Sequence, residues 1–126
     1  MEKQISKGLK TTFLIHFILG IIFGLIYLLI PEAWGKLINW TVKDPVMYRM
    51  IGAALVGYAA SSWFAYKQTA WETVQIVVQM EIVWTILATL VTIFGLVFAD
   101  LPAFGWVNAV IMCGFAVAFI VFYVRK

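Results

Sequence analysis

The chain has 126 residues, of which 64% are hydrophobic and 12% are charged, and its formal net charge at neutral pH is +3. Soluble proteins average ~45–50% and ~25%, and a chain this short cannot bury so much apolar surface in its own core. The composition excludes a soluble domain. Because the basic residues lie at segment ends and form no cluster, we expect no nucleic-acid partner.

Four long apolar stretches follow one another along the chain. About 20 helical residues cross the hydrocarbon core of a bilayer, and short connections make consecutive helices antiparallel neighbours. We therefore predict an all-α fold: one integral membrane domain over residues 1–126, built as an antiparallel bundle of four transmembrane helices. The predicted helices cover about residues 9–30, 45–66, 70–98 and 102–124.

The connections carry the signals that end and begin these helices. Pro31 ends the first helix. Residues 32–44 form the longest connection, and their helical spacing of apolar residues predicts a short interfacial helix; an irregular loop with tryptophan anchors is the alternative. Asp44 and the proline after it predict the start of the second helix, and a capping box from Thr69 to Glu72 predicts the start of the third.

Small residues recur at helical spacing on these segments. Helices in a membrane associate through close packing, because lipid tails are as apolar as leucine. Gly20 and Gly24 share a face of the first helix, and Ala53 and Gly57 share a face of the second. We predict that both pairs are helix-packing residues inside one bundle. A homodimer through Gly20 and Gly24 is the alternative.

Three ionisable residues lie within the apolar stretches: His16, Arg49 and Glu81. A charge at mid-membrane is costly, so such a residue marks a functional site by default. Each shares a face with small residues, so we expect Glu81 to contact Arg49 or His16 inside the bundle. Asn108 lies near the depth of Arg49, and Trp84 lies one turn from Glu81, where it could line a ligand cavity. The alternatives are a pair that only fixes helix register, an Arg49 that reaches the headgroups, and plain packing of Trp84.

Basic residues also indicate orientation, because cytoplasmic loops carry an excess of lysine and arginine. Lys36 and Lys43 lie at one end of the predicted helices. The opposite end carries more basic residues, namely Lys3, Lys7, Lys10, Lys67, Arg125 and Lys126. We expect a multi-pass protein of the cell (plasma) membrane with both termini cytoplasmic.

Several segments resemble those of small prokaryotic four-helix membrane proteins, broadly DoxX-like. They are the run from Arg49 to Gly57, Pro31 after the first helix, and Gly105 with Trp106 at the start of the fourth. The resemblance implies a four-helix bundle with an inward arginine on its second helix. It implies no activity and no catalytic residue.

These features favour a non-enzymatic membrane protein: a helper subunit, or a binder of a lipid or other apolar small molecule in a cavity between helices. Expected partners are membrane lipid and a membrane protein or a second copy. One histidine and no cysteine pair predict no metal and no cofactor. The alternatives are an oligomeric proton-coupled transporter that uses Glu81, and a membrane-embedded enzyme with His16 and Glu81 as acid and base.

Overall fold

The computed structural model describes residues 3–125, and five helices account for most of this range. They are α1 (Lys7–Leu29), α2 (Pro31–Leu37), α3 (Pro45–Tyr66), α4 (Trp71–Phe98) and α5 (Phe104–Val124). The all-α prediction is confirmed, and the long helices end within a few residues of the predicted positions. The short helix between the first two long ones is also present, although it ends at Leu37.

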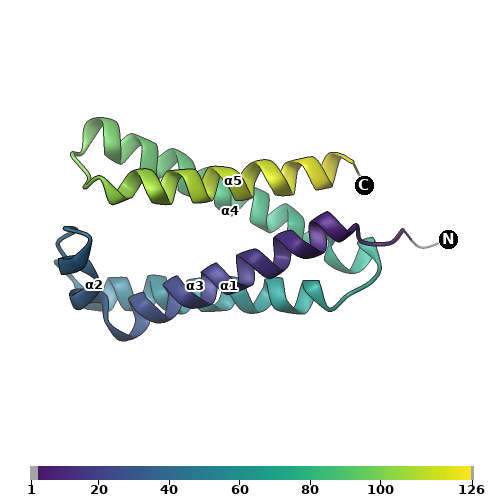
Figure 1. Ribbon diagram of the computed structural model, residues 1–126, viewed down its shortest axis with the longest axis horizontal. Coiled ribbons are helices and arrows are strands. Elements are labelled where there is room, and N and C mark those ends of the chain that lie inside the picture. The colour runs from purple at the N-terminus through teal and green to yellow at the C-terminus, as the bar shows by residue number, and fades with distance from the viewer. Residues whose placement is uncertain (1–2, 126) are drawn as a thin grey trace.

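The long helices form two antiparallel hairpins, α1 with α3 and α4 with α5 (Figure 1). Both ends of the described range lie at one end of the molecule, whereas α2 and the turn between α4 and α5 lie at the other. The hairpins approach each other near the chain ends and diverge toward α2 (Figure 1). The backbones of the two hairpins are therefore farther apart at the α2 end.

Local signals explain most of the helix ends. Pro31 takes the first position of α2, where its missing N–H costs nothing. Asp44 caps α3 as predicted, because its Oδ1 accepts hydrogen bonds from the backbone N–H of Val46 at 3.0 Å and of Met47 at 3.4 Å. The capping box at the start of α4 was a wrong prediction. The N-cap residue is Ala70, which makes no side-chain cap.

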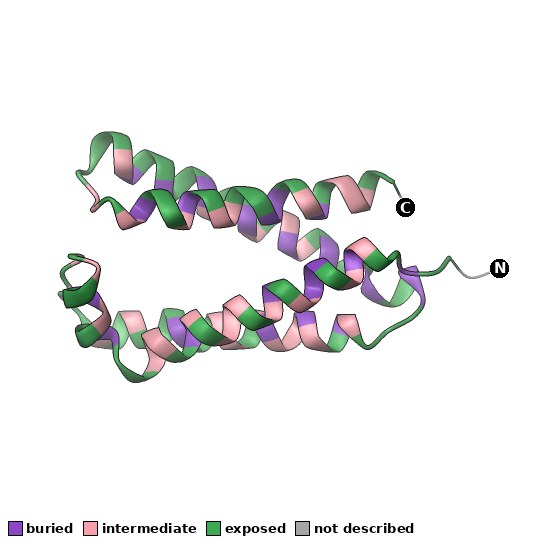
Figure 2. Cartoon of the chain, viewed as in Figure 1, coloured by how far each residue is buried: buried purple, intermediate pink, exposed green. Residues whose placement is uncertain are grey.

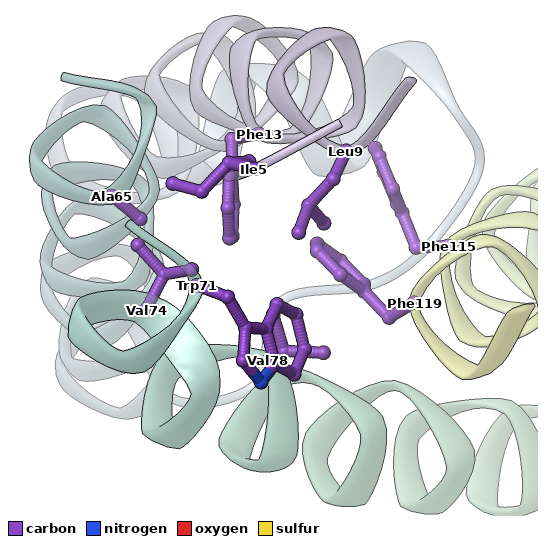
Figure 3. Packing of buried hydrophobic residues seen from close by; sticks show 9 residues of the cluster. All are labelled: Ile5, Leu9, Phe13, Ala65, Trp71, Val74, Val78, Phe115 and Phe119. Atoms are coloured by element: carbon purple, nitrogen blue, oxygen red, sulfur yellow. The ribbon is translucent and has the colours of Figure 1, made fainter. Parts of the chain in front are cut away.

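The hydrophobic core lies where the hairpins meet. Figure 3 shows its side chains converging from α1, from α5 and from the connected ends of α3 and α4. Phe13 and Phe119 are fully buried there with ring centroids 5.7 Å apart, which ties α1 to α5. The rest of the cluster consists of Ile5, Leu9, Ala65, Trp71, Val74, Val78 and Phe115. Packing in this core holds the two hairpins together at the end opposite α2.

The outer faces of the helices remain apolar. Many large hydrophobic residues are exposed on them (Figure 2), as expected for surfaces that face lipid. Among the described residues, α1, α4 and α5 are long and apolar enough to cross a membrane. The prediction of four such helices was wrong by the criteria of length and composition, because α3 does not meet them. It carries Arg49, Ser61 and Ser62 together with many small residues, which lower its hydropathy.

Glycines bring α1 and α3 into close contact. A Cβ atom at Gly20 would lie 2.9 Å from the Cβ of Ala59, and one at Gly24 would lie 2.9 Å from a methyl group of Val56. Both glycines therefore face α3 of the same chain at close range. The prediction was wrong for α3, where Ala53 is exposed and a Cβ at Gly57 would meet no atom within 4 Å.

Candidate functional site

A cavity of about 270 Å³ lies between the two hairpins at their diverging end. Every helix contributes to it, and its walls are mainly aliphatic and aromatic. Bundles commonly place ligands between facing helices in this way. The residues that line it include His16, Leu19, Gly20, Phe23, Tyr27, Trp34, Leu55, Tyr58, Trp84, Ala88, Phe104, Asn108 and Phe115.

Aromatic pairs join the hairpins across this cavity. Tyr58 of α3 and Trp84 of α4 have ring centroids 5.0 Å apart. At the mouth, the Trp34 ring of α2 meets the Phe104 ring of α5 edge-on at 5.4 Å and the Phe23 ring of α1 at 6.1 Å. Edge-to-face contacts of this kind are favourable at such distances. The short helix α2 therefore partly covers the outer mouth of the cavity.

A buried polar cluster lies deeper in the bundle and joins α1, α3 and α4. The Nδ1 atom of His16 lies 2.7 Å from Oγ of Ser62. Ser62 Oγ donates to Oε1 of Glu81 at 3.4 Å, and His16 Nε2 lies 3.2 Å from Glu81 Oε2. Ser62 and Glu81 have no exposed surface and His16 is 5% exposed. Three side chains that are distant in the sequence thus contact one another away from solvent.

The hydrogen bonds limit where the protons of this cluster lie. With the Ser62 hydroxyl donating its hydrogen to Glu81, Nδ1 of His16 is the donor toward Ser62, whereas in the other tautomer Nδ1 accepts from that hydroxyl. The opposite nitrogen then faces Glu81 either as N–H beside a carboxylate or as an acceptor beside a protonated acid. The 3.2 Å approach is within ion-pair distance, yet Glu81 Oε2 has no aligned hydrogen-bond partner. The two forms differ in whether this proton is on Nε2 of His16 or on the carboxyl group of Glu81.

Of these three residues, only His16 lines the cavity. Its ring also meets the Phe115 ring edge-on at 4.8 Å. Ser62 and Glu81 lie behind it and are fully buried. A molecule in the cavity would therefore touch the imidazole but not the hydroxyl or the carboxyl, so the serine is out of reach as a nucleophile.

The remaining predicted site residues divide between the cavity and the surface. Trp84 lines the cavity, and so does Asn108, whose amide donates to Oγ1 of Thr92 at 2.9 Å. Arg49 is exposed, and its Nε donates to the backbone oxygen of Leu28 at 3.2 Å. The predicted alternative of an Arg49–Glu81 contact was wrong, because Arg49 lies at the end of α3 where the hairpins diverge.

Ser62 was not among the predicted site residues, because the prediction took the face of Ala53 and Gly57 as the inner face of this helix. The buried face of α3 instead runs through Gly52, Ala59, Ser62 and Ala65. These residues are separated by seven, three and three positions, which is also a helical repeat. That spacing was the available signal for Ser62.

Among residues 3–125 no three histidine, cysteine, aspartate or glutamate side chains lie together as a metal site would require. Comparison with known proteins finds no matching family model, no similar curated protein and no similar solved structure. The DoxX-like resemblance thus stays a prediction, and the exposed Arg49 departs from the inward arginine that it implies.

Proposed function

We propose that this chain is a non-enzymatic integral membrane protein that binds a lipid chain or another apolar small molecule between its two hairpins. The observation that carries the proposal is the cavity of about 270 Å³ with its aliphatic and aromatic walls. A water-filled space with such walls is unfavourable, whereas an apolar ligand removes that surface from water. The volume suits one acyl chain segment or one small ring system and not a whole diacyl lipid.

Four membrane crossings follow from the packing in this proposal. The helix α3 lies antiparallel along α1, with Gly20 against Ala59 and Gly24 against Val56. If α1 crosses the bilayer, α3 lies at the same depth and crosses it too, and its contacts with α1 compensate for its lower hydropathy. The basic residues near the chain ends support cytoplasmic termini in the plasma membrane.

The polar cluster has a structural part in this proposal. His16, Ser62 and Glu81 link the α1–α3 hairpin to α4 at the inner end of the cavity. Buried polar contacts can fix one arrangement of helices. The cluster thereby defines the depth to which a ligand enters, and His16 presents one polar edge to it.

The test fills the cavity and counts bound lipid. Ala88 lines the cavity, so Ala88→Phe places a ring inside it, whereas Ala54→Phe places the same ring on the exposed face of α3. Native mass spectrometry of protein purified in mild detergent would report the lipid or other small molecule that stays bound. We expect a retained ligand in wild type and in Ala54→Phe, and its loss in Ala88→Phe. Equal retention in all three proteins would contradict the proposal.

One observation favours a second candidate function, proton-coupled transport through an assembly of several copies. His16 touches the cavity with one side and Glu81 with the other, so a proton on this pair lies next to a bound ligand. Transport of this kind would need Glu81, and Glu81→Gln would abolish proton-driven uptake into vesicles while retaining ligand binding. Unchanged uptake in Glu81→Gln would exclude this candidate.

A further inference from the structure

A second pocket, separate from the cavity, lies at the end of the bundle where the hairpins meet. Its volume is about 280 Å³, and the two ends of the described chain border it. We propose that this pocket binds the phosphate-bearing headgroup of an anionic membrane lipid. It is lined by Lys3, Gln4, Ser6, Leu9, Trp71, Phe122 and Arg125.

The polar side of the pocket carries two positive charges, on Lys3 and Arg125. Within residues 3–125 the one ion-pair contact is that of His16 with Glu81, so no described carboxylate neutralises either charge. A guanidinium group binds phosphate oxygens through paired N–H donors, and an ammonium group adds a point charge. Ser6 Oγ accepts from the Leu9 N–H at 3.1 Å, which leaves its hydroxyl hydrogen available as a further donor.

The other side of the pocket is apolar, and this favours a lipid over free phosphate. Leu9 and Trp71 belong to the buried core, and Phe122 packs against that core. An indole ring at the end of a spanning helix is typical of the boundary between headgroups and acyl chains. A lipid could place its phosphate against the cations and its glycerol and first methylene groups against these rings.

Backbone contacts hold this pocket in shape. The carbonyl oxygen of Lys3 accepts from the Trp71 N–H at 2.7 Å, and the Ile5 N–H donates to Thr69 at 2.8 Å. Residues 3–5 are thereby fastened beside the start of α4. On the other side, the ring of Phe122 occupies the space that a side chain at Gly8 would need. The end of α5 therefore lies directly against the start of α1, and Arg125 lines the same pocket as Lys3.

The surroundings add long-range attraction for an anion. Lys7, Lys10 and Lys67 lie at the same end of the bundle, with Glu72 as an exposed acidic residue among them. Basic residues next to a membrane surface attract anionic lipids. This site depends on residues remote from the cavity, so its failure would not affect the cavity proposal.

The experiment measures lipid affinity of the full chain in mild detergent by native mass spectrometry. Dioleoyl phosphatidylglycerol is compared with dioleoyl phosphatidylcholine, which has the same acyl chains and no net charge. We expect wild type to prefer the anionic lipid, and the double variant Lys3→Gln/Arg125→Gln to bind it roughly 30-fold more weakly. The variant Lys3→Arg/Arg125→Lys keeps both charges and should retain the preference.

The matched control is Lys36→Gln/Lys43→Gln, which removes the same charge at the opposite end of the bundle. It should bind phosphatidylglycerol like wild type, and an equal loss in this control would show general charge attraction and overturn the site. Equal affinity of wild type for phosphatidylglycerol and phosphatidylcholine would also overturn the site. Displacement of phosphatidylglycerol by millimolar inorganic phosphate would reassign the pocket to a free anion and overturn the lipid proposal.

Discussion

The buried carboxyl group of Glu81 connects the two hairpins through His16 and Ser62. The sequence predicted that Glu81 would meet either His16 or Arg49, because each shares a helix face with small residues. The structure favours His16, since its Nε2 lies 3.2 Å from Glu81 Oε2, whereas Arg49 is exposed and donates to the backbone oxygen of Leu28. The hydroxyl of Ser62 completes the cluster by contacting both partners.

At the scale of single residues, removing the imidazole of His16 should strongly destabilise the protein. We expect His16→Ala to lower the free energy of unfolding by about 2–5 kcal/mol, because it leaves a buried carboxyl group without its partner. The double variant His16→Leu/Glu81→Leu should lose less free energy of unfolding than the single variants His16→Leu and Glu81→Leu lose in sum. Both quantities can be measured by titrating the protein from mild detergent into dodecyl sulfate and following helix content.

Arg49→Gln supplies the control for this prediction. The Arg49 side chain is exposed and makes one hydrogen bond, to Leu28, so its loss should cost about 1 kcal/mol or less. A destabilisation by Arg49→Gln as large as that of His16→Ala would contradict the assignment of His16 as the partner of Glu81.

At the scale of the helices, the contact between α1 and α3 depends on backbone approach at glycine. A Cβ atom at Gly52 would lie 2.5 Å from the backbone nitrogen of Leu28 and 2.7 Å from the carbonyl oxygen of Gly24. Backbone atoms cannot move aside as a flexible side chain does. Gly52 was absent from the predicted packing residues, and Gly57, which was among them, faces outward. The helix α3 is therefore rotated relative to the prediction.

Two glycine-to-alanine changes on α3 test this rotation. Gly52→Ala should destabilise the protein by about 1–3 kcal/mol, because it forces α1 and α3 apart. Gly57→Ala meets no atom within 4 Å and should be neutral or stabilising by up to ~1 kcal/mol, since alanine favours helix over glycine. Thermal unfolding in detergent, followed by circular dichroism, would measure both. The reverse order of stabilities would show that Gly57, and not Gly52, faces α1.

At the scale of the whole molecule, the number of membrane crossings decides where the chain ends lie. Three helices qualify as spans by length and composition, whereas the packing of α3 along α1 supports a fourth. With four crossings both chain ends lie on one side of the membrane, and with three they lie on opposite sides. In the structure the chain ends share one end of the bundle (Figure 1).

Single cysteines in a Cys113→Ser background can distinguish these topologies. A membrane-impermeant maleimide applied to one side of sealed vesicles should label Gln4→Cys and Gln68→Cys together. It should label Glu32→Cys only from the opposite side, because α1 separates that position from Gln4. Labelling of Gln68→Cys and Glu32→Cys from the same side would show that α3 does not cross and would remove the four-crossing proposal.

The class of the protein and the positions of its helices were readable from the sequence by itself. Long apolar stretches, Pro31 and the Asp44 cap act locally, so their meaning does not depend on the rest of the chain. Only the tertiary structure decided how α3 is rotated about its axis. The same holds for the contacts of Ser62 with His16 and Glu81 and for the position of the cavity. Helices that are apolar on every side give no amphipathic signal, because the face toward lipid and the face toward a neighbour have the same composition. Close packing at Gly24 and Gly52, together with divergence of the hairpins beyond the shared core, determines which faces meet and where space remains.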